Sequence, residues 1–311
     1  MSYAVSTQRA YSTHRNNYLE FCEKIKCNAV PVTTENLCRY AAYLGRTKSF
    51  ASVQQYLNII RVVHLEMGFA NPLKDNFALK SVLAGLKRGK GAGQTFKLPL
   101  NPLDLLNIRK HLVLSRIADS QIWAVILCCF YGLFRVSNVA QIHKMGKADP
   151  KVIRRQDLTI TQQGCIITVF ASKTLQFKDR SCQVPIPYLQ SHPLCPTSAI
   201  ISFLSKAGNV SNGSSLFSVQ QGQQTINITQ TEVRKRLNQL CSKIGLPSER
   251  YGTHSLRRGG ATWMFLAKVP LQVIKTIGDW KSDCVLRYIT PDINSNMDII
   301  TKAAKCIPKD C

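Results

Sequence analysis

Apolar residues recur at helical spacing through the first third of the chain and predict four short helices. The four segments are 6–26, 33–45, 49–68 and 72–89. The second opens with a threonine pair and is expected to stop at Gly45, and the third is expected to end at Gly68. Helices of this length, joined by short connections, predict a small helical bundle.

This periodicity breaks at 89–102, where three glycines and two prolines accompany polar residues. Such a composition is typical of a linker. We therefore predict a helical domain over 1–90, a linker over 91–96 and a second domain over 97–311.

The second domain contains both helix-type and strand-type patterns. Helical spacing predicts helices over 103–117, 119–132, 196–206, 229–243, 254–268, 270–278 and 283–289. Three β-type segments, 157–161, 165–172 and 181–187, predict a small antiparallel sheet. The expected fold class is therefore mainly α with a small antiparallel β-sheet (α+β).

Charge narrows the class of partner. Among 311 residues, 41 are basic and 17 acidic, which gives a net charge of +24. The excess is shared, with 13 basic and 5 acidic residues in 1–96 and 28 and 12 in 97–311. A strong positive field of this kind favours a polyanionic partner, and both domains are expected to contact the same nucleic acid.

Several classes of chemistry lack their sequence signals. No C-x-x-C pair suggests a zinc site, the carboxylates are too scattered for a magnesium site, and 85–91 lacks the spacing of a P-loop. We therefore expect no metal and no cofactor. The chain opens without a secretory signal, and the apolar run 122–134 is too short to span a membrane.

The stretch 251–269 combines cationic residues with a following apolar helix pattern. His254 and Arg257 are three residues apart, so they share one face of a helix. Arginine grips phosphate oxygens with its planar fork, and histidine donates a hydrogen bond or transfers a proton. Arg258 is expected to point elsewhere, toward a neighbouring phosphate or solvent. A further arginine, Arg135, follows the apolar helix and needs a partner there, because burying an unpaired charge is costly.

Together with 277–292, these segments resemble the tyrosine recombinase/integrase family, and the wording of 253–263 and 280–289 resembles eukaryotic mobile-element recombinases of the DIRS/Crypton kind. The resemblance implies that 1–90 is a DNA-binding core-binding domain and 97–311 a catalytic domain. It also implies an ordered set of catalytic residues: Arg135, Lys173, His254, Arg257, Trp280 and Tyr288. Lys178 stays open as the alternative to Lys173. Where the family usually has an acidic residue three positions after the first arginine, this chain has Asn138.

The resemblance further implies a mechanism. Tyr288 attacks the scissile phosphate and forms a 3′-phosphotyrosyl bond, the two arginines clamp the non-bridging oxygens, and Lys173 protonates the leaving 5′-oxygen. His254 assists as acid or base, and Trp280 orients the site through its N–H. The implied partners are double-stranded DNA and further copies of the chain, as a tetramer in the synaptic complex. The implied location is the nucleus in a eukaryote, or the cytoplasm and nucleoid in a bacterium.

Three other functions stay open at this point. The first is a non-catalytic DNA-binding protein derived from a recombinase, which would use the same basic surfaces. The second is a type IB topoisomerase, which shares the tyrosine chemistry. The third is a basic structural protein that binds RNA, although no aromatic-rich RNA-recognition motif is visible.

Overall fold

The computed structural model describes residues 5–91, 97–146, 149–170 and 181–290, together with positions 297, 300 and 301. The chain divides into two compact units, Met1–Thr95 and Phe96–Cys311. Its described part is mainly helical with small antiparallel sheets, which confirms the expected fold class. Within the described residues, none of the helices combines the length and apolar character that a membrane span needs.

The first unit consists of the four predicted helices. They are α1 (Val5–Ile25), α2 (Thr34–Thr47), α3 (Phe50–Glu66) and α4 (Phe77–Lys90). The side chains of Thr33, Ser49 and Asn76 accept hydrogen bonds from the first turns of α2, α3 and α4, which fixes where each begins. The aromatic and aliphatic faces of the helices meet in one buried core.

Gly45 does not end its helix, contrary to the sequence expectation. Helix α2 continues to Thr47, and a Cβ atom at Gly45 would press on the side chain of Leu86 in α4. The glycine therefore permits a close helix contact. Gly68 follows α3 with a φ of 80°, a left-handed conformation that glycine adopts without strain, so the predicted stop is confirmed.

The second unit contains the remaining elements. Its helices are α5 (Pro102–Lys110), α6 (Ile117–Tyr131), α7 (Val136–Val139), α8 (Pro196–Leu204), α9 (Gln230–Lys243), α10 (Thr253–Leu266) and α11 (Leu271–Ile277). Its strands are β1 (Leu158–Thr161), β2 (Gly164–Val169), β3 (Cys182–Pro187), β4 (Val219–Gln221) and β5 (Gln224–Ile226), and its 3-10 turns are η1 (Arg155–Asp157) and η2 (Asp283–Arg287). The sequence pattern missed α7 and the β4–β5 hairpin, and it extended α5 too far.

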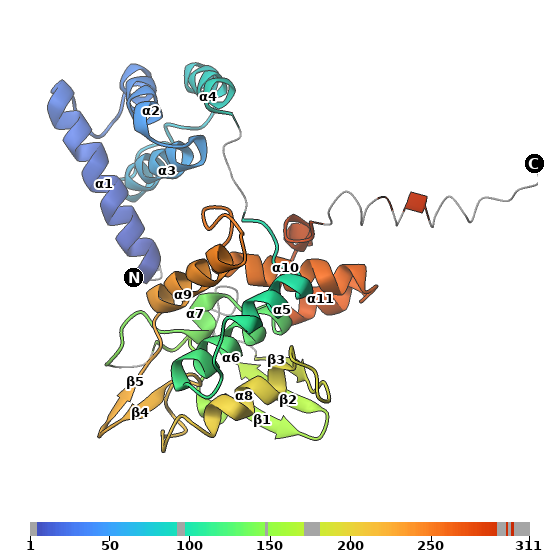
Figure 1. Ribbon diagram of the computed structural model, residues 1–311. Coiled ribbons are helices and arrows are strands. Elements are labelled where there is room, and N and C mark those ends of the chain that lie inside the picture. Colours follow the sequence, from blue (N-terminus) through green and yellow to red (C-terminus); the bar gives the residue numbers. More distant parts are fainter. Residues whose placement is uncertain are drawn as a thin grey trace, which may run out of the picture. The chain divides into compact units, whose positions relative to one another are not determined.

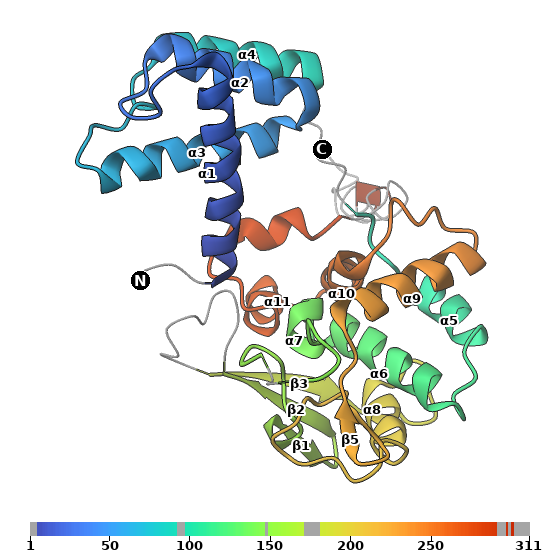
Figure 2. The same cartoon turned by 90° about the vertical axis from the view of Figure 1, so that its left-hand side faces the viewer.

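Helix α6 is the centre of this unit. It is buried on nearly all sides and packs against α8 and α10, and α8 also contacts β3 (Figures 1 and 2). The strands form an antiparallel sheet in the order β1-β2-β3, with Leu158 opposite Ile167 and Cys165 opposite Ile186. The apolar run 122–134 is thus a core helix whose C-terminal end leads directly to Arg135.

The predicted last helix, 283–289, is a single 3-10 turn. Ser282 caps it, because the Ser282 hydroxyl accepts from the Cys284 amide at 3.4 Å. Asp283 instead pairs with Lys275 of α11 at 3.2 Å. Tyr288 follows the turn directly, and its amide donates to the Val285 carbonyl at 2.8 Å.

Candidate active site

Helix α10 carries three of the cationic side chains that the sequence singled out. His254, Arg257 and Arg258 lie in its first half, and the two arginines are buried. Gly259 and Gly260 follow them, and a Cβ atom at either position would overlap a backbone carbonyl, that of Leu100 or Phe130. The glycine pair therefore lets α10 lie directly on neighbouring protein segments. This close packing fixes the position of Arg257 and Arg258 within the second unit.

We expect Gly260→Ala to destabilise the second unit by about 1–3 kcal/mol, because its new methyl group has no room beside the Phe130 carbonyl. Chemical denaturation of the full chain measures the loss. Gly213→Ala is the matched control, since nothing lies within 4 Å of a Cβ atom there. Equal stability of the two variants would contradict the packing explanation.

Arg257 joins three segments of the second unit. Its side chain is 3% exposed. Its Nη1 donates to the Leu133 carbonyl after α6, and its Nη2 donates to the Gly278 carbonyl after α11 at 2.6 Å. Its guanidinium also lies 4.0 Å from the ring centroid of Trp280. Burial, and then the charge of Arg135, lowers the pKa of Arg257, although a guanidinium stays protonated at neutral pH.

Arg135 precedes the short helix α7, which Asn138 stabilises. The amide of Arg135 donates to Asn138 Oδ1 at 3.2 Å, and Asn138 Nδ2 donates to the Lys151 carbonyl at 3.5 Å. Asn138 is buried, and its own carbonyl accepts from the Ile153 amide at 2.8 Å. The residue that stands in place of the usual acid thus anchors the backbone of the Arg135 turn.

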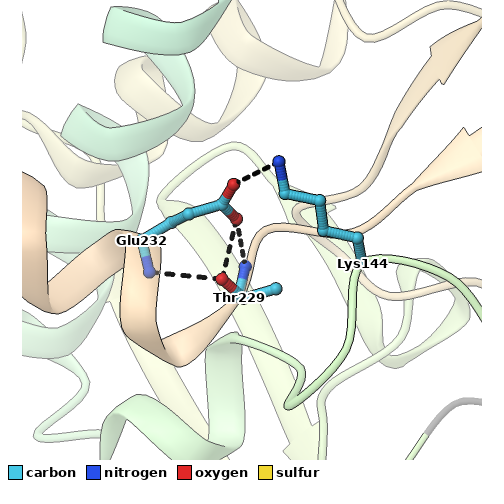
Figure 3. A network of polar contacts seen from close by, with 3 residues as sticks. All are labelled: Lys144, Thr229 and Glu232. Atoms are coloured by element: carbon cyan, nitrogen blue, oxygen red, sulfur yellow. Dashed lines mark hydrogen bonds and ion pairs between the residues drawn. The ribbon is translucent and has the colours of Figure 1, made fainter.

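The segment that follows α7 is fixed to the beginning of α9 (Figure 3). Glu232 accepts from the Thr229 amide at 2.9 Å and hydroxyl at 2.8 Å, and it pairs with Lys144 at 2.8 Å. Burial alone raises the pKa of Glu232, but the contacts with Lys144 and Thr229 outweigh it and hold the pKa below its usual value. The Glu232 carboxylate therefore stays ionised at neutral pH and links the segment after α7 to the beginning of α9.

Arg135 and Arg257 line the same small pocket. Asp279 lines it as well, together with Val169 at the end of β2 and Cys182 at the start of β3. The connection between these two strands carries the predicted lysines Lys173 and Lys178, both of which lie outside the described residues. Two arginine side chains beside one pocket are an arrangement suited to a phosphate group.

His254 lies one turn before Arg257 on α10, with its side chain exposed to solvent. Partial desolvation, followed by the charges of Arg257, Arg135, Arg258 and Arg234, lowers the pKa of His254. The imidazole is therefore neutral at pH 7. In this state one ring nitrogen accepts a proton while the other donates a hydrogen bond.

Trp280 and Tyr288 complete the cluster. Their ring centroids are 5.0 Å apart, and the Arg257 guanidinium lies 5.4 Å from the Tyr288 ring. Tyr288 is half-buried, whereas Trp280 is buried and no described residue accepts a hydrogen bond from its Nε1. In this structure the indole supports Arg257 with its ring face, and the expected role of its N–H toward DNA stays a prediction.

Sequence reasoning missed Asp279 beside this cluster, and it expected a different orientation of Arg258 from the one observed. Asp279 lines the arginine pocket with a φ of 51°, a left-handed conformation that aspartate tolerates better than most residues. Arg258 was expected to reach solvent or a second phosphate, but it is 7% exposed and contacts the Tyr288 segment. Each directly adjoins a predicted site residue in sequence, and this adjacency was the available signal.

The described structure thus brings Arg135, His254, Arg257, Trp280 and Tyr288 into one region of the second unit. No family model matches the sequence, and no curated protein matches it. Solved structures do match, and they share the expected fold.

The integrase of transposon Tn1549, in complex with transposon right end DNA, aligns with a TM-score of 0.66 and 12% identity over 97% of this chain and 95% of that chain. The XerH site-specific recombinase, bound to a palindromic difH substrate in a post-cleavage complex, aligns with a TM-score of 0.61 and 15% identity over 89% of this chain and 72% of that chain. A lambda integrase dimer bound to a COC′ core site aligns with a TM-score of 0.54 and 13% identity over 88% of this chain and 70% of that chain. The chain therefore has the fold of tyrosine recombinases.

Proposed function

We propose that this protein is a site-specific DNA recombinase that cleaves and rejoins strands through Tyr288. The observation that carries the proposal is the placement of the Tyr288 ring within 5.4 Å of the guanidinium of Arg257, which shares a pocket with Arg135. A tyrosine hydroxyl is a poor nucleophile at neutral pH unless positive charge stabilises its anionic form and the developing phosphorane. The cluster supplies that charge.

In the proposed reaction the phenolic oxygen of Tyr288 bonds to the scissile phosphorus, and the bond from phosphorus to the 5′-oxygen breaks. The products are a 3′-phosphotyrosyl link and a free 5′-hydroxyl, whose proton comes from Lys173. Arg135 and Arg257 bind the non-bridging oxygens, and neutral His254 acts as the base that accepts the proton lost by the phenol. Attack by a 5′-hydroxyl on the covalent link reverses the chemistry and joins strands without an external energy source.

The substrate proposed for both units is duplex DNA. Supporting observations are the net charge of +24, its spread over the two units, and the DNA complexes in which the similar integrases and recombinases were solved. We further propose that several copies assemble on DNA, that 1–90 binds the duplex while 97–311 cleaves it, and that the protein belongs to the DIRS/Crypton kind and works in the nucleus of a eukaryote.

The test is covalent capture. Wild-type protein incubated with a pool of nicked duplexes is expected to form an adduct that survives denaturing electrophoresis, because the nick lets the short 5′-product diffuse away and traps the phosphotyrosyl link. Protease treatment should collapse the adduct to a peptide-linked strand, and mass spectrometry should locate the peptide. Absence of an adduct from every pool, with DNA binding intact, would favour the non-catalytic DNA-binding protein.

A further inference from the structure

The turn that carries Tyr288 is attached to α10 by two side chains one helical turn apart. Arg258 Nη1 donates to the Arg287 carbonyl at 2.7 Å. Thr262 Oγ1 donates to the Tyr288 carbonyl at 3.2 Å and accepts from the Thr290 amide at 3.0 Å. Residues four apart on a helix project from the same face, so Arg258 and Thr262 act side by side. The backbone on both sides of the tyrosine is thereby fixed.

Arg258 holds this segment from a buried position. Its side chain is buried, and burial lowers its pKa, so its charge is retained at a cost in desolvation. Its guanidinium lies 5.9 Å from the centroid of the Tyr288 ring. The side chain of Arg287 is exposed, so Arg258 holds that residue by its carbonyl and not by its side chain. One cation thus contacts the tyrosine segment and faces the tyrosine ring.

We propose that Arg258 is a positioning residue for Tyr288, with Thr262 as its partner on α10. The inference rests on the proposed function, in which Tyr288 is the nucleophile. Arg257 and Arg258 then have different roles at neighbouring positions. Arg257 lines the proposed phosphate pocket, whereas Arg258 orients the Tyr288 phenol toward it.

Positioning of this kind has a large expected effect on rate. A displacement of about 1 Å of a reacting group costs on the order of 10²-fold in a chemical step, even when binding is unchanged. A protein with a net charge of +24 is expected to contact many phosphates of a duplex, so the loss of one buried arginine should leave the DNA affinity nearly intact. The kinetic signature is therefore a slower cleavage step at saturating DNA.

The test compares four single substitutions in the full chain. Arg258→Met removes the donors and charge but keeps the length of the side chain, Arg258→Lys keeps one donor group and the charge, and Thr262→Val removes only the hydroxyl. Arg109→Met is the matched control, because Arg109 also donates to a backbone carbonyl, that of Leu112 at 3.1 Å, within the same unit. Each variant is examined by hydrogen–deuterium exchange and by single-turnover adduct formation on nicked DNA.

We expect faster exchange in 287–290 for Arg258→Met and Thr262→Val, and unchanged exchange there for Arg109→Met. Adduct formation at saturating DNA should fall roughly 10- to 100-fold in Arg258→Met, with DNA affinity within about threefold, and Arg258→Lys should recover part of the rate. A purely structural role predicts no such selective recovery.

The two possible failures are distinguishable. Unchanged exchange in 287–290, or a wild-type cleavage rate in Arg258→Met, would overturn the positioning role. If the wild type forms no adduct, the proposed recombinase function fails. The exchange experiment then still reports whether Arg258 and Thr262 hold the Tyr288 segment, but the assignment of Arg258 to a nucleophile is lost.

Discussion

A Tyr288→Phe variant is expected to bind DNA normally and to form no covalent adduct with it. The substitution removes one oxygen and keeps the ring that packs 5.0 Å from Trp280. The Tyr288 backbone contacts Thr262 and Val285, and the variant keeps both contacts, so the local structure should persist. Without the phenolic oxygen no bond to phosphorus forms, so adduct should fall below detection on nicked duplexes, as read on denaturing gels.

Tyr251→Phe is the control for this experiment. Tyr251 is also partly buried in the second unit, immediately before α10, and partial burial raises its pKa, which makes its hydroxyl a poorer nucleophile. We expect this variant to form adduct at the wild-type rate. If Tyr288→Phe still formed the adduct and Tyr251→Phe did not, Tyr251 would be the nucleophile.

Long segments with a clear period were predictable from sequence because their buried faces are continuous. Helices α1 and α3 follow this rule, whereas α6 was predicted from its continuous apolar run and the three strands of the main sheet from their β-type sequence. Helix α7 and the β4–β5 hairpin are too short to establish a period, so only tertiary contacts define them. Gly45 shows the converse, because a glycine that signals a helix end in sequence serves a helix contact in space.

The candidate site was predictable to the extent that it repeats an ordered set of residue types. The sequence placed His254 and Arg257 on one helix and put Tyr288 shortly after Trp280, and the structure brings all four together. The sequence did not indicate that Arg257 stacks on the ring face of Trp280, or that the Arg258 side chain is buried. Those facts depend on carbonyls contributed by residues 20 or more positions away, such as Gly278 and Arg287.

An Arg257→Lys variant is expected to lose at least about 10²-fold in the rate of adduct formation while DNA affinity changes little. The guanidinium holds the Leu133 and Gly278 carbonyls and stacks on Trp280, and its buried Nε has no partner among the described residues. A lysine ammonium cannot make both carbonyl contacts and present a planar fork at the same time. Single-turnover kinetics at saturating nicked DNA, with affinity measured separately, gives both quantities.

Arg155→Lys separates this effect from a general loss of structure. Arg155 is a partly buried arginine of the same unit that donates to the Ser218 carbonyl at 3.0 Å, and, as in Arg257, its buried Nε has no partner among the described residues. Arg155→Lys should lose some folding stability and keep the wild-type rate of cleavage, whereas Arg257→Lys should lose cleavage. A wild-type rate in Arg257→Lys would mean that a single positive charge suffices at this position, and that the bidentate clamp is not the source of transition-state stabilisation. Equal losses in the two variants would assign the effect to the fold, because Arg155 does not line the pocket that Arg257 shares with Arg135.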